Sequence, residues 1–130
     1  MKVWLLFGLI GCEMTPSFVD TKDIEQATAR GAWGTVCKGL EMSEDRIRQY
    51  AAEQLWKNKA PTEDMACICE HLPKSDGGFD PAIAAGLEGL KSDAIAQCFA
   101  DLVKNPELKK REEAVVAFAK MTAPSVRTVL

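Results

Sequence analysis

The stretch TEDMACICEHL, residues 62–72, carries the local signals that decide the fold. Thr62 followed by two acids is typical of a helix start, because a threonine side chain caps free N–H groups and acids complement the helix dipole. Met65, Ile68 and Leu72 then follow at intervals of three and four residues. This spacing places them on one face of an α-helix. The stretch therefore predicts an amphipathic helix with one buried side.

The same start signals recur along the chain. A Ser, Thr, Asp or Asn cap, followed by proline or an acid in the first turn, opens each of the other predicted helices. The cap residues are Thr21, Ser43, Asp80 before Pro81, Ser92, and Asn105 before Pro106. Ala, Leu, Glu and Lys are frequent and aromatic residues make up 7% of the chain, which favours helices over strands. We predict an all-α chain whose first helix spans residues 23–40 without a break.

The predicted helices also repeat. Three short blocks align: VCKGL at residues 36–40, ICEHL at 68–72 and CFADL at 98–102. Their last leucines are 32 and 30 residues apart, and each block is followed by a turn and a second helix. This period indicates stacked helical hairpins, since one hairpin cannot bury its apolar face alone. The pattern resembles HEAT repeats and predicts a short α-solenoid of about three helical hairpins in residues 21–130, with a plain helical bundle as the alternative.

The group CICEH contains Cys67, Cys69 and His71, the only histidine in the chain. A c-type haem site is excluded, because it requires two residues between the cysteines and a histidine directly after the second. A metal site stays open as an alternative, since Cys67 and His71 share one helix face. Zinc, however, needs three or four ligands, and no second close cysteine pair is present. We therefore predict no metal or other cofactor, and His71 is expected on the surface without a special role.

Helical geometry selects one disulfide pairing. At about 100° per residue, Cys69 lies at one edge of the core face of its helix and Cys67 lies beyond the opposite edge. Cys37 occupies the position of Cys69 one repeat earlier, and Cys98 lies on the opposite edge from Cys69 one repeat later. Side-by-side stacking then brings Cys37 to Cys67 and Cys69 to Cys98. Free buried cysteines are the remaining alternative.

The first twelve residues predict export. Lys2 precedes an apolar run at residues 3–10, which is far shorter than the roughly 20 residues that span a bilayer. A charged start and a short apolar core are typical of a secretion signal. The first twelve residues end in Leu9-Ile10-Gly11-Cys12, which resembles the lipobox of bacterial lipoproteins. In that family the cysteine receives a diacylglycerol, the signal is cut before it, and the new amino terminus is acylated.

The resemblance implies that residues 1–11 are a signal peptide and that Cys12 is the lipidated first residue of the mature chain. Residues 12–20 then form a tether to a bacterial envelope membrane, with the outer membrane slightly favoured because Glu13, rather than Asp, follows the cysteine. An oxidising compartment permits disulfides. The five cysteines would then divide into one lipidated and four paired.

Composition and motifs argue against several classes of function. Without its signal the chain has 15 basic and 19 acidic side chains, and no basic block, which argues against nucleic-acid binding. No nucleophile–base pattern or phosphate loop stands out, and Glu112 and Glu113 beside a basic run are typical of a solvated helix face. Trp33 and Trp56 are expected in the core. We predict a protein-binding module without catalysis or a small-molecule substrate, whose partner is another envelope protein; the alternative is a thiol-redox or metal-binding protein using the CICEH group.

Overall fold

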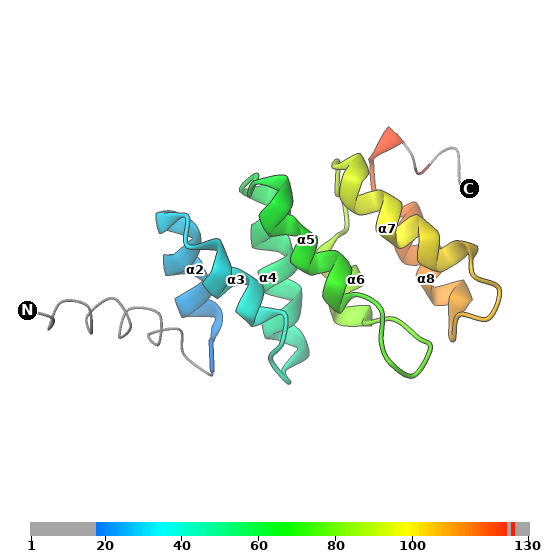
Figure 1. Ribbon diagram of the computed structural model, residues 1–130, viewed down its shortest axis with the longest axis horizontal. Helices are drawn as coiled ribbons and strands as arrows, with labels where there is room; N and C mark the ends of the chain where they lie inside the picture. Colours follow the sequence, from blue (N-terminus) through cyan, green and yellow to red (C-terminus); the bar gives the residue numbers. More distant parts are fainter. Residues whose placement is uncertain (1–17, 125, 127–130) are drawn as a thin grey trace, which may run out of the picture.

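A computed structural model of the protein describes residues 18–124 and 126. Within these residues it is all-α, as predicted, with no strand (Figure 1). The helices are α2 (Thr21–Arg30), α3 (Trp33–Gly39), α4 (Asp45–Lys57), α5 (Thr62–His71), α6 (Pro81–Gly86), α7 (Asp93–Lys104) and α8 (Arg111–Ala119). The predicted signal peptide, the lipobox with Cys12 and residues 13–17 of the predicted tether lie outside the described residues, as do residues 125 and 127–130.

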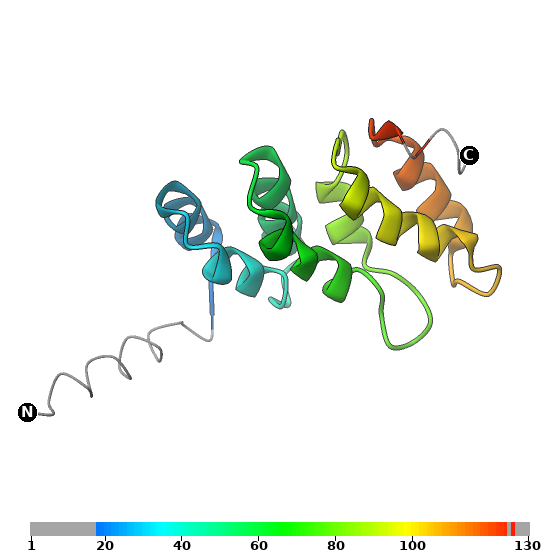
Figure 2. The ribbon, with the colours of Figure 1, turned by 45° about the horizontal axis from the view of Figure 1, so that its top comes forward.

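The helices form two layers. In one layer α2 contacts α4, α4 contacts α6, and α6 contacts α8; in the other, α3 contacts α5 and α5 contacts α7. Figure 1 shows α3, α5 and α7 in front of α4, α6 and α8, and Figure 2 shows the same row from a second side. Successive helices therefore pass back and forth between the layers. This order is compatible with stacked hairpins, and the HEAT-like assignment stays a prediction.

The first predicted helix is in fact two helices. α2 ends at Arg30, and Gly31 follows in the left-handed conformation with φ 73°. The N–H of Gly31 donates to the carbonyls of Ala27 and Thr28, which is how a glycine closes a helix end. α3 then starts at Trp33 and runs in a different direction (Figure 1). The prediction of an unbroken helix was wrong because the apolar spacing continues across a glycine that ends the helix.

The fold begins earlier than predicted, at the end of the proposed tether. Val19 is fully buried, and Asp20, rather than Thr21, caps α2 by accepting a hydrogen bond from the Asp23 N–H. The Asp23 carboxylate accepts in return from the Asp20 N–H. The hydrogen bond from the Asp23 backbone lowers the pKa of Asp20 below its usual 3.8, so the cap stabilises the fold above that pH and is lost as the pH falls through the lowered pKa.

The other helix starts agree in part with the prediction. Asp80 and Ser92 are the N-caps of α6 and α7 as expected, whereas α4 and α5 start after Glu44 and Pro61 instead of Ser43 and Thr62. The largest difference is α8. It begins five residues after Pro106, because the Asn105 side chain accepts from the Glu107 N–H and its carbonyl accepts from the Leu108 N–H, which close a turn.

The core lies between the two layers and runs along the whole row. Its largest fully buried side chains include Ile24, Leu55, Ile83, Phe99 and Phe118. The rings of Phe99 and Phe118 are 5.6 Å apart between centroids, so α7 and α8 share one aromatic contact.

Two of the three tryptophans are less buried than expected. Trp33 and Trp56 pack against the core but keep part of their surface accessible. Trp56 is held by its indole N–H, which donates to the Gly86 carbonyl at 2.8 Å. Its position therefore depends on α6 as well as on its own helix, α4.

Candidate functional site

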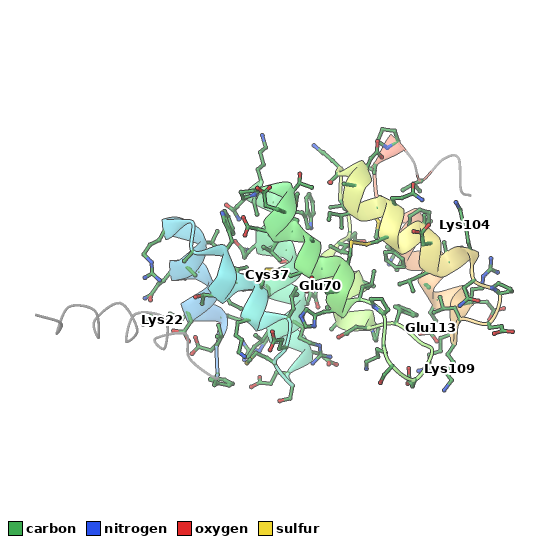
Figure 3. The ribbon with its side chains drawn as sticks, in the orientation of Figure 1. Lys22, Cys37, Glu70, Lys104, Lys109 and Glu113 are labelled. Carbon is green, nitrogen blue, oxygen red and sulfur yellow. A yellow bond between two sulfur atoms is a disulfide. The ribbon has the colours of Figure 1, made fainter. Side chains whose placement is uncertain are left out.

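Two disulfides join the three helices of one layer. Cys37 of α3 bonds to Cys67 of α5, and Cys69 of α5 bonds to Cys98 of α7. Both pairs are the predicted ones, and their Cα atoms are 6.0 and 5.9 Å apart. Figure 3 shows Cys37 where α3 faces α5. All four cysteines pack against the core without being fully buried, so the bonds clamp neighbouring helices along one side of the core.

The three residues Cys67, Cys69 and His71 of the CICEH group each contact a different part of the protein. Cys67 and Cys69 point to opposite neighbours of α5, since they pair with α3 and α7 respectively. His71 is half-buried, and its Nε2 lies 3.9 Å from a carboxylate oxygen of Glu41. In the described part of the chain, no group of three or more His, Cys, Asp or Glu side chains is arranged to hold a metal ion. The structure thus does not bring Cys67, Cys69 and His71 together at one point.

A largely buried ion pair that the sequence did not reveal joins α4 to α6. The guanidinium of Arg48 donates to Asp80 at 2.7 Å and to the Met42 carbonyl at 2.8 Å, and it also contacts Asp45. Asp80 is buried and accepts from the Ala82 N–H as the cap of α6. Partial burial lowers the pKa of Arg48, but the bonds with Asp80 and Asp45 outweigh it and leave that pKa raised. Of this arrangement, the sequence indicated only that Asp80 caps a helix, because Pro81 follows it.

The surface has three hollows of interest. The first, which we call the Tyr50 hollow, lies between α2 and α4, has a volume of about 700 Å³ and contains Tyr50. Lys22, Arg46, Glu25 and Glu53 also line it. Burial, together with Glu25 and Glu53, raises the pKa of Tyr50 above its usual value. Both charge signs are mixed around this hollow, so it has no preference for an anion or a cation.

The second, the Val116 hollow, lies between α6 and α8 and measures about 250 Å³. Phe79 and Ala117 form part of its lining, together with Val116, which is 58% exposed. Glu113 and Lys120 lie at the same hollow. Its lining is apolar with both charge signs beside it.

The third, the Trp56 hollow, lies where the end of α4 meets the connection between α6 and α7. Its volume is about 410 Å³, and Trp56, Met65 and Leu90 line it. Two of its other lining residues, Lys57 and Lys91, are exposed. None of the described residues that line it is acidic. This hollow alone among the three combines an apolar lining with charges of one sign.

Comparison with known proteins adds no family. No protein-family model, no curated protein and no solved structure matches the chain. In the described part of the chain, no helix is long and apolar enough to cross a membrane.

Proposed function

We propose that this protein is a lipid-anchored protein of the bacterial cell envelope that binds another envelope protein through a disulfide-clamped row of helices. Cleavage before Cys12 and acylation of that residue would provide the anchor, since two acyl signals are enough for stable attachment. Binding, without catalysis and without a cofactor, is the proposed activity.

The observation that carries this proposal is the pairing of all four cysteines outside the lipobox. Disulfides form and persist in exported proteins and are rare in the cytosol. The remaining cysteine, Cys12, follows Leu9-Ile10-Gly11 at the end of a short apolar run. Disulfides at Cys37–Cys67 and Cys69–Cys98 and a lipobox cysteine require the same route out of the cell, so the two features support each other.

The arrangement of the clamped helices supports a binding role. The disulfides fix α3, α5 and α7 relative to one another, and the hollows lie on connected helices that pack against this layer. A surface that is already rigid loses little conformational freedom when a partner docks, which favours affinity. In this proposal, the two disulfides keep the binding surface in one conformation outside the cell.

The experiment that tests export is the intact mass of the full chain, extracted from membranes with detergent and kept non-reduced. We expect loss of residues 1–11, added acyl mass at Cys12 and four missing hydrogens. The control is Cys12→Ser, which should retain residues 1–11 and carry no acyl mass. A native protein that keeps Met1, carries free thiols and fractionates with the cytosol would refute the proposal.

A thiol-redox function is the second candidate, because two disulfides converge on one helix. Cys67 and Cys69 are two residues apart on α5, and both residues are half-buried. A redox protein should turn over repeatedly: its reduced cysteine pair reduces a disulfide substrate to two thiols and becomes a disulfide, which two glutathione molecules then reduce again with formation of glutathione disulfide. The measurement is turnover of a disulfide-linked fluorescent peptide with glutathione as the reductant. Stoichiometric reduction without turnover favours structural clamps, and bound metal in the purified reduced protein would favour the metal-binding variant of this alternative.

A further inference from the structure

The floor of the Trp56 hollow is apolar and recessed. Met65 and Leu90 are buried, as is Ala60, and Trp56 is partly accessible beside them. The connections α4–α5 and α6–α7, which border the hollow, lie at the same upper edge of the molecule in Figure 1 and again in Figure 2. An apolar floor below the surface accepts a single side chain more readily than a flat surface does.

The hollow is held in shape by backbone contacts. The indole N–H of Trp56 donates to the Gly86 carbonyl at 2.8 Å. Gly89 has φ 85°, and a Cβ there would lie 3.5 Å from the Trp56 ring, so this backbone packs directly on the indole. On the other side Lys59 has a positive φ of 56°, and its N–H donates to the Trp56 carbonyl at 3.2 Å. The site is therefore formed before any partner arrives.

The rim of the hollow is cationic. Lys57, Lys59 and Lys91 are exposed and line it, and its described lining residues include no acid. Lys57 extends over the Trp56 ring, with 5.7 Å between Nζ and the ring centroid. The whole chain has a net charge of −3, so this local excess of positive charge is opposite to that of the molecule. A ligand that complements this hollow carries negative charge next to an apolar group.

Ser92 adds a hydrogen-bonding group to the rim. It lines the hollow as the N-cap of α7, and its side chain makes no capping hydrogen bond with that helix. A hydroxyl in this position is able to donate to a carboxylate oxygen. The rim thus offers ammonium groups and a hydroxyl around an apolar floor.

We propose that the Trp56 hollow binds an acidic segment of the partner protein, with one apolar side chain on the floor and flanking carboxylates at Lys57, Lys59 and Lys91. This inference rests on the proposed protein-binding function and assigns the surface that performs it. A peptide fits better than a membrane, because a bilayer meets protruding groups over a broad area, whereas the apolar groups here are recessed.

The test uses the detergent-extracted full chain and fluorescein-labelled peptides in an anisotropy assay. The probes are a set of nonapeptides with a central Phe, Leu or Trp between Asp and Glu residues. One control set replaces every acid with Asn or Gln, and another replaces the central residue with Ala. We expect at least one acidic peptide to bind more than about tenfold tighter than both of its controls, with affinity falling as salt increases.

Two matched variants distinguish an effect of the rim lysines from an effect of the change in net charge. The triple variant Lys57→Glu, Lys59→Glu and Lys91→Glu should weaken binding more than about tenfold, because like charges then face each other. The control triple variant Lys22→Glu, Lys104→Glu and Lys109→Glu changes the net charge equally at exposed positions on other parts of the row (Figure 3). Its affinity should stay within about twofold of the unmodified chain. Circular dichroism checks that both variants keep their helices.

Several outcomes overturn the assignment. These are no binding by any acidic peptide, no preference over the neutral or Ala-centred peptides, and an equal loss in both triple variants. Two further results would also contradict the proposal, if no peptide binds. Binding of phosphatidylglycerol vesicles that depends on the rim lysines would assign these lysines to a membrane surface. Self-association in sedimentation that depends on them would assign them to a second copy of the chain. The two experiments fail independently. If the mass shows no signal cleavage or acylation, a positive peptide result still stands. If no peptide binds but the mass is as expected, the protein is lipidated and disulfide-bonded and its binding surface lies elsewhere.

Discussion

The Arg48–Asp80 pair joins two helices through side chains that are almost out of water. The exposed fractions are 13% for Arg48 and 7% for Asp80. Each charge is compensated, since Asp80 also accepts from the α6 backbone and Arg48 also donates to the Met42 carbonyl. Removal of one partner leaves the other charge buried without its ion pair, which is the costly situation.

We expect Arg48→Met to lower the free energy of unfolding by about 3 kcal/mol, because Asp80 then keeps a buried charge without its cation. Urea denaturation at neutral pH measures the change, and the slope of the transition should stay the same.

Arg46→Met is the matched control. The Arg46–Glu44 pair has side chains that are 69% and 51% exposed, so its loss should cost less than about 1 kcal/mol. Similar losses in the two variants would contradict the role of burial that the Arg48 prediction assumes.

At the level of elements, the approach of α6 to α4 depends on a residue without a side chain. A Cβ on Gly86 would lie 2.4 Å from the Gln49 carbonyl oxygen and 2.9 Å from the Ala52 Cβ. The backbones therefore meet at a distance that other residues do not allow, and the carbonyl of Gly86 is left in reach of the Trp56 indole. One glycine thus determines both the packing of the two helices and the wall of the Trp56 hollow.

We expect Gly86→Ala to lower the free energy of unfolding by about 1–3 kcal/mol, because α6 must move away from α4 to admit the methyl group. The thermal midpoint followed by circular dichroism measures this loss.

Gly34→Ala is the control within α3. A Cβ there meets nothing within 4 Å, so the same substitution should leave stability unchanged or raise it by up to about 1 kcal/mol. If both alanine variants gave the same midpoint, close helix packing at Gly86 would not be the cause.

For the whole molecule, the two disulfides connect helices from near the start of the row to near its end. They close loops with sequence separations of 30 and 29 residues. In the chain-entropy model, each such loop contributes on the order of 3–4 kcal/mol. Since a typical domain has about 5–15 kcal/mol in total, the pair supplies a large share of the stability.

We therefore expect dithiothreitol to lower the urea midpoint of the native protein strongly, with each single disulfide responsible for roughly half of the loss. The four-serine variant at Cys37, Cys67, Cys69 and Cys98 should show the low midpoint with or without reductant. A native midpoint that does not respond to full reduction would contradict a stabilising role for the clamps.

Local signals in the sequence were sufficient for the helical class and for the cysteine pairing. Caps such as Asp80 and apolar spacing act within one or two turns, so they can be read without knowledge of the fold. The cysteine pairing could be predicted because α3, α5 and α7, which carry the four cysteines, pack side by side in that order. The break at Gly31 also had a local signal, an arginine followed by glycine, but the continuing apolar pattern hid it.

The amino-acid sequence by itself thus determined that this chain is helical and which sulfurs meet, since both follow from helical periodicity and from the similar spacing of the three cysteine-containing helices. Only the tertiary structure decided the Arg48–Asp80 pair and the Trp56 hollow. Arg48 and Asp80 are far apart in sequence and have no shared motif. The lysines of the hollow come from the end of α4, the α4–α5 connection and the α6–α7 connection, which become neighbours only when α4 packs on α6. The physical reason is that such contacts depend on the distance between helices, which Gly86 and the buried core set together.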